Sequence, residues 1–391
     1  MIRLAEQTIS EEELHRLSEW ILKNEKLTKG PLTEQFEEAF SQYIGSKFSV
    51  FVNSGSSANL LIAQALKVSG RLKYNRVILP AVSWVTTVTP FLQLGFDVRL
   101  CDCSSTDLGL DISSLEQMID EFDPALVVLV NVLGHSNEII SIRALCEAHG
   151  VFLVEDSCEA LGSESDGRRL GCHGIAGSFS FYYGHHISTI EGGMVVTDDE
   201  ELWSLMKSVR SHGWARDVDS KTLKAWKKNA GAEIDEFRNL YTFYHSGFNL
   251  RSTDLQAFLG LSQLEKLPEI SEARSRNFAQ YRVRLGDFFV QTSCTQFVSS
   301  FAYGTLVTSP LEVGSHLKCN NVESRPLICG NIGRHPFWVS EQGLSRNKNA
   351  DFVHDFGIYL PNHHLLSADE INRVCDLFLE VAEPKQFNQS I

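Results

Sequence analysis

Apolar and polar positions alternate along the first half of the chain in a pattern that predicts strands and helices in turn. Short apolar runs predict strands at 48–52, 77–80, 97–102, 125–133 and 151–154. Apolar residues that recur every three to four positions predict helices at 8–22, from 31 onward, and at 58–68, 85–94, 112–122 and 139–149. The run at 125–133 is apolar throughout, as in a strand buried on both faces. We therefore predict a doubly wound α/β sheet, which binds ligands beyond the carboxyl ends of its strands.

The pattern changes after residue 197. Residues 217–238 form a polar, Lys-rich segment with no strong period, which is typical of a solvated face. A helix at 252–267 is predicted to end at Pro268, because proline lacks an amide hydrogen, and a second helix follows at 270–285. These helices introduce a smaller C-terminal unit.

The length and composition of the chain indicate how many domains it has and where in the cell it is located. A chain of 391 residues exceeds the size at which one core usually stops growing. We therefore predict a large α/β domain with N-terminal helices at residues 1–250 and a small α+β domain at residues 251–391. No apolar run reaches the ~20 residues of a membrane span, and the acidic, weakly apolar N-terminus does not resemble a signal peptide. We expect a cytoplasmic protein with no membrane partner.

Charge and cysteine usage disfavour further classes of function. The formal charge of −14 disfavours nucleic acid and anionic membranes as partners, because either would be repelled. The nine cysteines are scattered without a framework, which is typical of reduced thiols in the cytosol. Cys101 and Cys103 lie close together without a His or Cys cluster of zinc spacing, so no metal site is predicted.

A turn rich in small residues directly follows the first predicted strand. Residues 54–57 (SGSS) stand between that strand and the next helix. Free amide groups at a helix start, with serine hydroxyls beside them, form an anion site suited to phosphate. The alternative is a plain helix cap without a ligand. Trp84 and Asp156 follow two other predicted strands, at the same edge of the sheet.

Two adjacent histidines, His185 and His186, lie in the stretch GSFSFYYGHHISTIEGGMV at residues 177–195. Strand-like residues precede and follow the pair, and Gly192 and Gly193 allow the main chain to approach another segment closely. An isolated histidine pair on a turn is usually structural. The surrounding motifs decide between a structural and a catalytic role.

Five ordered segments resemble a known family: NSGSSANLL, PAVSWVTT, VEDSCEALG, SFSFYY with EGGMVVTDD, and SGFNLR. In this order they resemble the DegT/DnrJ/EryC1/StrS sugar aminotransferases, which are vitamin B6 enzymes with the aspartate aminotransferase fold (fold type I). The resemblance covers roughly residues 8 to 380. It implies a pyridoxal phosphate transferase with a large mixed-sheet domain, a smaller C-terminal domain, and homodimers that share their active sites.

The reactive lysine of that family is missing from this chain. In the family it stands nine positions before the second glycine of the Glu-Gly-Gly turn, counted inclusively, and here that position is His185. No lysine occurs between Lys73 and Lys207, so a neighbouring lysine does not replace it. The variant HHI resembles a branch that removes the C3 hydroxyl of nucleotide-linked 4-keto-6-deoxy sugars. Within it, IEGG, RSHGW and SRPLICGN resemble enzymes that act on GDP-4-keto-6-deoxy-D-mannose for colitose in the lipopolysaccharide O-antigen.

The chemistry of histidine fits that branch. The resemblance implies pyridoxamine phosphate bound without a covalent link, release of ammonia, and regeneration of the cofactor by L-glutamate. An imidazole with a pKa near ~6.5 can take a proton and pass it to the leaving hydroxyl, yet it cannot trap the product as a lysine does. We expect His185 to be this base. In the alternative, His186 does the work and His185 only packs.

The resemblance implies a set of cofactor-binding residues, namely Gly55, Ser56, Trp84, Asp156, Glu159, Ser180 and Asn249. Gly55, Ser56 and Ser180 would bind the phosphate. Asn249 would reach the same phosphate from a neighbouring subunit.

Two of these residues would contact the cofactor ring, and a third would face the same pocket. Asp156 would pair with the pyridinium nitrogen and keep it protonated, although an Asp at a strand end is otherwise often a helix cap. Trp84 would stack on the ring, and its alternative is a buried core residue. Glu159 would face the same pocket if the segment is helical, or cap locally.

Substrate-contacting loops are expected around His212, Arg216, Glu323 and Arg325, again by resemblance. Arginine suits a diphosphate because its guanidinium presents a fork of donors. Surface arginines are common, so a solvated role is the alternative.

Three other functions compete with the dehydratase. A reductive iron-sulfur dehydrase of a CDP- or dTDP-linked sugar is disfavoured, because no cysteine lies between Cys172 and Cys294 to ligate a cluster. A nucleotide-sugar aminotransferase would need another amine in place of the lysine. A silent cofactor-binding scaffold is disfavoured by the retained pocket motifs, since a scaffold needs no cofactor pocket.

Overall fold

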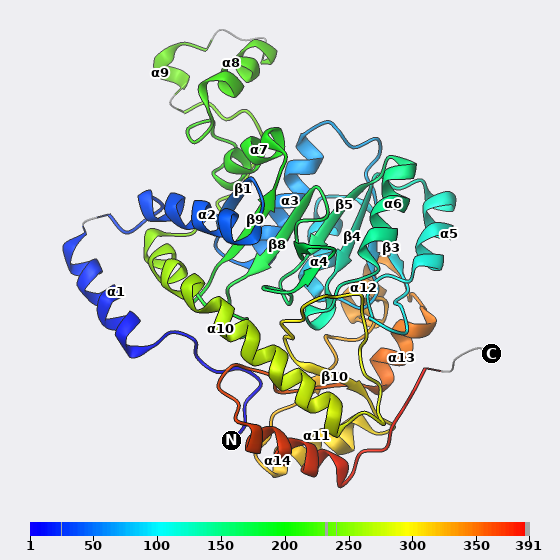
Figure 1. Cartoon of the computed structure of the whole chain (residues 1–391). Helices are drawn as coiled ribbons and strands as arrows, with labels where there is room; N and C mark the ends of the chain where they lie inside the picture. Colours follow the sequence, from blue (N-terminus) through cyan, green and yellow to red (C-terminus); the bar gives the residue numbers. More distant parts are fainter. Residues whose placement is uncertain (25, 231–233, 240, 388–391) are drawn as a thin grey trace.

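The described residues form a seven-stranded and a three-stranded sheet joined by a long helix, with a separate two-stranded ribbon (Figure 1). The computed structural model describes residues 1–24, 26–230, 234–239 and 241–387. The larger sheet contains β1 (Phe48–Val52), β2 (Arg76–Pro80), β3 (Asp97–Cys101), β4 (Leu126–Val130), β5 (Phe152–Asp156), β8 (Ala176–Ser180) and β9 (Gly193–Thr197). Its order is β1-β9-β8-β5-β4-β2-β3, and β9 runs antiparallel to both of its neighbours. The predicted doubly wound mixed sheet is confirmed.

Helices cover both faces of this sheet, because its central strands are apolar on both sides. Every residue of β4 is buried. One face packs against α3 (Gly55–Val68), α4 (Val85–Gln93) and α7 (Glu200–Arg210). The other face packs against α5 (Ile112–Phe122), α6 (Ile139–His149), α2 (Pro31–Ile44) and the first half of α10 (Asp254–Arg284). Parallel strands covered in this way leave their carboxyl ends as the open edge, where ligands bind.

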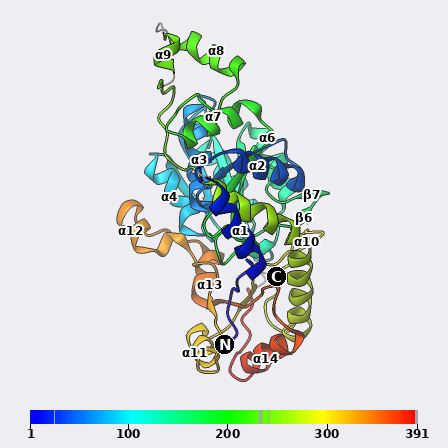
Figure 2. The same ribbon diagram turned by 90° about the vertical axis from the view of Figure 1, so that its left-hand side faces the viewer.

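The smaller sheet lies at the far end of α10 (Figures 1 and 2). Its order is β10-β12-β11, formed by β10 (Tyr303–Leu306), β12 (Gly357–Leu360) and β11 (Arg325–Pro326). The accompanying helices are α11 (Pro310–Cys319), α12 (Pro336–Gln342), α13 (Lys348–Phe356) and α14 (Ala368–Leu379). A separate core cluster, with Phe278 and Tyr281 of α10, holds this unit together. A C-terminal α+β unit is therefore present.

The predicted domain boundary at residue 250 falls just before α10 and stays a prediction. Ile2 packs in the core of the smaller unit and bridges Val322, so the first residues lie with the C-terminal sheet. Residues 388–391 of the predicted second domain lie outside the described residues. A two-stranded ribbon, β6 (Glu164–Ser165) with β7 (Arg168–Arg169), and α1 (Glu11–Lys23) complete the frame of the larger unit.

The predicted break at Pro268 is wrong, because α10 runs through it without interruption from Asp254 to Arg284. A capping box at Thr253 starts the helix, and Pro268 itself lies on its exposed side. Leu267 and Ile270 are buried against the larger unit, and Tyr281 is buried in the smaller one. Packing at both ends therefore outweighs the hydrogen bond that proline removes.

The segment after Arg216, predicted to lack a strong period, contains two helices, α8 (Ser220–Asn229) and α9 (Glu236–Asn239). Asp219 caps α8 by accepting hydrogen bonds from the amides of Lys221 and Thr222, both at 2.9 Å. None of the residues of α8 is buried, which explains the missing apolar period. The two helices project from the body of the molecule in both ribbon views (Figures 1 and 2).

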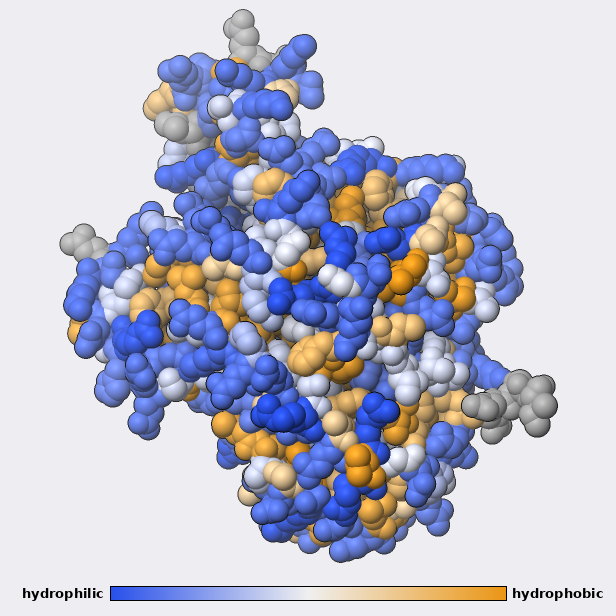
Figure 3. All heavy atoms as spheres, viewed as in Figure 1, coloured by the Kyte–Doolittle hydropathy of each residue, from blue (hydrophilic) through white to orange (hydrophobic). Residues whose placement is uncertain are grey.

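Hydrophilic residues cover most of this projecting segment on the face shown in Figure 3. On the same face, apolar residues reach the surface between α1 and α2 (Figure 3). Of the helices that the structure describes, none has both the length and the apolar character of a membrane span.

We expect Pro268→Ala to raise the free energy of unfolding by about 1–3 kcal/mol, because alanine restores an amide donor and removes a ring clash inside α10. Urea and thermal unfolding followed by circular dichroism measure the change. Pro310→Ala is the matched control, because Pro310 stands in the first turn of α11, where proline is tolerated. A Pro268→Ala variant no more stable than the parent would contradict this account of α10.

Candidate active site

A cavity of about 370 Å³ opens at the carboxyl ends of the central strands. Its walls are formed by the starts of α3 and α4, by the segments that follow β5 and β8, and by the C-terminal segments around residues 301, 325–328 and 359. The lining residues are Ser54, Gly55, Ser56, Asn59, Trp84, Thr86, Thr87, Val130, Asp156, Cys158, Glu159, Ser180, Tyr182, Gly184, His185, Glu191, Phe301, Arg325, Ile328 and Tyr359. The predicted ligand edge of the sheet is therefore where the cavity lies.

The start of α3 faces this cavity and presents free amide groups. Ser54 caps the helix, its hydroxyl accepting a hydrogen bond from the Ser57 amide at 3.0 Å. A methyl group on Gly55 would lie only 2.6 Å from Cβ of Ser180, so glycine is required for this close approach. A methyl group on Gly193 would lie 2.4 Å from the Ser54 carbonyl, so the Glu-Gly-Gly turn also packs directly on the helix start. Helix amides and the Ser180 hydroxyl thus converge in an arrangement that suits a phosphate.

Asp156 ends β5 and points into the cavity, with its side chain almost fully buried. Its Oδ2 accepts hydrogen bonds from Asn59 Nδ2 and from Thr87 Oγ1, both at 2.8 Å. Its Oδ1 accepts a longer bond of 3.2 Å from the Cys158 amide. The carboxylate is held by the neighbouring helices α3 and α4, an arrangement that places negative charge in the cavity rather than only capping the chain locally.

Trp84 immediately precedes α4, lines the cavity and is 55% exposed. It is not the buried core residue of the alternative interpretation. An indole left open beside an anion site can cover the face of a flat ligand.

Glu159 lies deep in the same cavity. Burial raises the pKa of its carboxyl to about 8, and the Asp156 carboxylate adds to the rise. The Leu133 amide, which donates a hydrogen bond to Oε2 at 2.9 Å, opposes the shift. Near neutral pH the Glu159 carboxyl is therefore largely protonated and can donate a hydrogen bond.

The two histidines lie in different environments. His185 lines the cavity, and its ring packs at 5.2 Å from the Phe301 ring. Its Nδ1 is buried and has no partner among the described residues. Burial lowers the pKa of His185 to about 4, so the imidazole is neutral and able to accept a proton at pH 7.

His186 is fully buried and does not line the cavity. Its Nε2 donates a hydrogen bond to the Ser299 carbonyl at 2.9 Å. This geometry favours His185 over His186 for chemistry in the cavity.

The structure brings together most, but not all, of the predicted site residues. Arg325 lines the cavity from β11, opposite Tyr359 of β12. Glu323 lies outside it, where Oε2 accepts a hydrogen bond from the Leu4 amide at 3.0 Å. Asn249 and His212 are exposed near the base of the projecting segment and do not line the cavity. Their predicted roles stay predictions.

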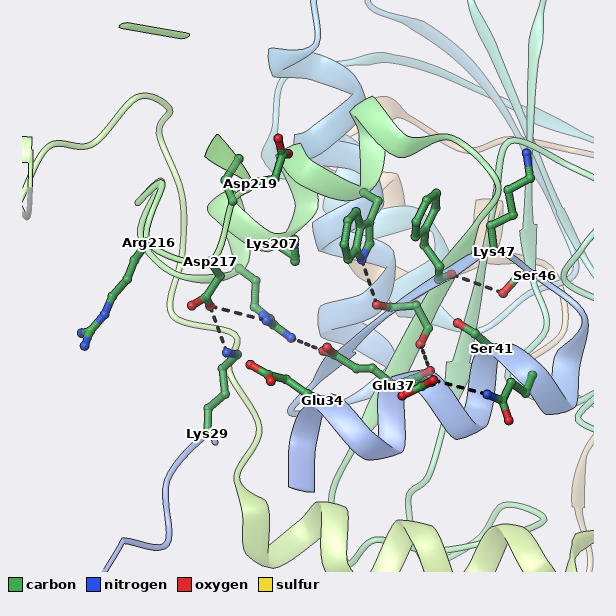
Figure 4. A pocket seen from close by; sticks show the side chains of 17 residues that line it. Lys29, Glu34, Glu37, Ser41, Ser46, Lys47, Lys207, Arg216, Asp217 and Asp219 are labelled. Carbon is green, nitrogen blue, oxygen red and sulfur yellow. Dashed lines mark hydrogen bonds and ion pairs between the residues drawn. The ribbon is translucent and has the colours of Figure 1, made fainter. Parts of the chain in front are cut away.

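Arg216 lines a second hollow, of about 750 Å³, between α2, α7 and residues 216–219 (Figure 4). Ion pairs cross this hollow: Lys29 Nζ lies 3.0 Å from Asp217 Oδ2, and the buried Arg210 pairs with Glu37 at 2.5 Å. Figure 4 shows Arg216 pointing away from the Asp217 pair. The ion pairs of Asp217 with Lys29 and Arg210 tie the base of the projecting segment to the body of the molecule.

Several residues of the cavity were not predicted from the sequence. Asn59 lies one turn after Gly55 in an otherwise apolar helix, and Thr87 lies close to Trp84, so both carried a local signal. Phe301 and Tyr359 carried none, because they are far from the other motifs in the sequence and meet them only in the folded chain.

The cavity fits a pyridine ring that carries a phosphate. It combines an anion site at a helix start, an open indole face, a buried carboxylate and an imidazole with a free buried nitrogen. Within the described part of the chain, no group of three or more His, Cys, Asp and Glu side chains is placed to hold a metal ion.

Comparison with known proteins extends these observations. Over 388 residues the chain is 32% identical to GDP-4-keto-6-deoxy-D-mannose 3-dehydratase of Yersinia pseudotuberculosis, covering 96% of this chain and 97% of the relative. A crystal structure of GDP-4-keto-6-deoxymannose-3-dehydratase with a trapped PLP-glutamate geminal diamine superposes with a TM-score of 0.88 at 30% identity, covering 97% of this chain and all of the other.

Aminotransferases are also related to this chain. It is 32% identical over 261 residues to UDP-4-amino-4,6-dideoxy-N-acetyl-beta-L-altrosamine transaminase of Helicobacter pylori, covering 67% of this chain and 64% of the relative. The predicted fold of vitamin B6 transferases is thereby confirmed. The model of the DegT/DnrJ/EryC1/StrS aminotransferase family matches residues 7–379, and the chain belongs to this family.

Proposed function

We propose that this protein is a pyridoxal phosphate/pyridoxamine phosphate-dependent 3-dehydratase of a nucleotide-linked 4-keto-6-deoxyhexose. The proposed substrate is GDP-4-keto-6-deoxy-D-mannose; the products are the 4-keto-3,6-dideoxy sugar and ammonia, and L-glutamate regenerates pyridoxamine phosphate. The carrying observation is that His185, and no lysine, lines the cavity among the described residues, at the position of the family's reactive lysine. Similarity to the Yersinia dehydratase supports the same assignment. The proposed place in colitose and O-antigen synthesis rests on the resemblance of the sequence motifs.

When bound, pyridoxamine phosphate supplies an amine for the C4 ketone of the sugar and a ring that accepts electrons. The amides of α3 and the Ser56 and Ser180 hydroxyls would hold its phosphate. The Asp156 carboxylate, fixed by Asn59 and Thr87, would keep the ring nitrogen protonated.

His185 is the proposed base, and its low pKa leaves the imidazole free to take a proton at neutral pH. The same group then carries that proton to the departing C3 hydroxyl, which leaves as water. Trp84, which lines the cavity with an exposed indole, would stack on the cofactor ring. Glu159, protonated below about pH 8, would donate a hydrogen bond to the cofactor.

Residues around the cavity mouth are proposed to bind the nucleotide diphosphate. Arg325 already lines the cavity and offers a forked donor for a phosphate. Glu323 lies two residues away on the same segment. His212 and Arg216 would join the substrate site only when a second subunit places them there.

A homodimer with shared active sites is therefore part of the proposal. Asn249, the predicted phosphate ligand, is exposed and outside the cavity of its own chain. The projecting segment near it exposes Phe237 by 84%, Tyr241 by 73% and Phe243 by 53%. Exposed aromatic side chains so close together favour contact with another protein surface.

An aminotransferase is the second candidate, supported by the similarity to the Helicobacter transaminase. It would require an amine other than a lysine at position 185. The sugar product distinguishes the two functions, because a dehydratase yields a deoxy sugar and an aminotransferase yields an amino sugar.

The test of the function incubates the protein with pyridoxal phosphate, L-glutamate and GDP-4-keto-6-deoxy-D-mannose. We expect ammonia and a sugar nucleotide lighter by one oxygen atom, measured by a coupled ammonia assay and mass spectrometry. The same reaction with CDP- and dTDP-linked sugars tests the nucleotide. An amino sugar as the product would falsify the dehydratase and favour the aminotransferase.

We expect His185→Asn to reduce turnover by about a hundredfold or more, because the amide cannot accept the proton. Cofactor uptake, followed by the absorbance of pyridoxal phosphate after gel filtration, should persist, because the phosphate and ring contacts remain. His149→Asn is the matched control, since His149 ends α6 at the surface far from these contacts. If His185→Asn turns over like the parent, another residue is the base.

The dimer is tested by replacing Phe237 and Phe243 together with serine. We expect the parent to sediment at twice the chain mass and the double variant to shift toward the monomer, with weaker cofactor binding because Asn249 no longer reaches a partner. Leu311→Ser is the control, because Leu311 is 85% exposed on α11 in the smaller unit. A parent that sediments as a monomer and is fully active contradicts the shared site.

A further inference from the structure

Arg274 of α10 is a buried cation directly behind the active-site wall. Its side chain is only 2% exposed, and it forms no ion pair with any carboxylate in the described residues. Burial lowers the pKa of its guanidinium to about 9, so the group remains charged at neutral pH. Burying a charge without a counter-charge is unfavourable unless other dipoles replace water.

Main-chain carbonyls supply those dipoles. Nη1 of Arg274 donates hydrogen bonds to the carbonyls of Phe301 at 2.9 Å, of Ser300 at 3.4 Å, and of Asn362. Asn362 in turn donates from Nδ2 to the Arg274 and Ser300 carbonyls, both at 3.1 Å. The guanidinium thus fixes residues 300–301, which lie outside regular secondary structure and are not held by the hydrogen bonds of a β-sheet.

This segment forms the wall behind the histidines. The Phe301 ring lines the cavity and lies 5.2 Å from the His185 ring on one side and 6.0 Å from Cζ of Arg274 on the other. The preceding carbonyl, of Ser299, accepts the hydrogen bond of His186. Each carbonyl from Ser299 to Phe301 is therefore tied either to the histidine pair or to Arg274.

We propose that Arg274 is a positioning residue for the reaction. Its hydrogen bonds to the Ser300 and Phe301 carbonyls fix the Phe301 ring, against which the His185 ring packs. Its guanidinium also places a fixed positive charge near that imidazole. The proposal rests on the proposed function of His185 as base. Arg274 itself does not line the cavity, so we expect it to contact neither the cofactor nor the sugar.

Together with burial, the positive charge of Arg274 lowers the pKa of His185. The titratable groups that act on His185 are Asp156 at the end of β5, His186 beside it and Arg274 on α10. The cavity that His185 lines is also lined by Glu159, Glu191, Arg325 and Tyr359. Burial, the largest effect, and Arg274 lower the pKa of His185, whereas the main chain of Cys158 and the Asp156 carboxylate oppose the shift. Burial, and after it Arg274, also lowers the pKa of His186, His363 and His364, and Lys266 adds to the shift at His364, so protonation of these histidines is disfavoured.

Three variants separate the two parts of the role. Arg274→Met removes charge and hydrogen bonds, Arg274→Lys keeps the charge without the fork, and Arg276→Met is the control, because the Arg276 side chain is 69% exposed on the same helix. We expect Arg274→Met to lower kcat by about ten- to a hundredfold, with little change in KM for the sugar nucleotide, because a displaced base slows the chemical step more than it weakens binding. We expect Arg274→Lys to recover part of kcat, and Arg276→Met to match the parent.

The second readout is the protonation of His185 in the cofactor-free protein, followed by NMR of ¹³C-labelled histidine and assigned with His185→Asn. We expect the His185 titration and the acid limb of kcat/KM to move to higher pH in Arg274→Met and to stay near the parent values in Arg274→Lys. If Arg274→Met does not fold, as judged by circular dichroism, Arg274→Lys and Arg274→Gln provide the same comparison.

Parent-like kcat, pH profile and His185 titration in the Arg274 variants would overturn the proposal while leaving the dehydratase intact. Equal losses of kcat and of thermal stability, without a shift of the His185 titration or the acid limb, would also overturn it, because they describe a purely structural clamp. Failure of the proposed function shows itself separately, as a parent protein that releases no ammonia. The NMR titration still reports on Arg274 in that case.

Discussion

The main chain at the start of α3 lies against the turn between β8 and β9 with no room for a side chain, and the rest of the site depends on this contact. Gly55 and Gly193 are the two positions where any larger residue would collide with Ser180 or with the Ser54 carbonyl. Because they are glycines, the helix amides, the Ser180 hydroxyl and the histidine turn share one cavity. The parallel strands supply the remaining groups, since their carboxyl ends all reach the same edge.

Two buried arginines fix segments of the chain that are not part of the seven-stranded sheet. Arg210 pairs with Glu37 and the Phe51 carbonyl, and through Asp217 it fixes the base of the projecting segment. Arg274 is bonded to carbonyls and fixes the wall of the cavity. In both cases Nη1 of the guanidinium donates hydrogen bonds to more than one acceptor. The long helix α10 carries Arg274 and packs against both units, so the wall of the site is bonded to the helix that joins them.

At position 185 this chain has a histidine where the resemblance to its family implies a reactive lysine. The anion site, the carboxylate at the end of β5 and the open indole need no change to serve either chemistry, which illustrates how one fold hosts different reactions. A lysine would be charged in water and becomes a nucleophile when desolvated, whereas an imidazole buried at the same place is neutral and accepts a proton. The environment of His185, apolar on the Phe301 side and cationic behind, favours that neutral form.

The sequence by itself determined the alternation of strands and helices, the edge of the sheet that carries the site, and the replacement of lysine by His185. These features are local: apolar runs, the SGSS turn and the Glu-Gly-Gly turn are read within a few residues. Tertiary structure decided the rest. Pro268 stays inside α10 because burial at both ends of the helix outweighs one lost hydrogen bond. Helix α8 has no buried residue, so no strong apolar period in the sequence predicts it. Asn59 and Thr87 hold Asp156, and Arg274 stands behind Phe301 and His185, because segments distant in sequence meet across the fold. Burial and long-range contact set the pKa of His185 and Glu159, and no local pattern of residues contains either quantity.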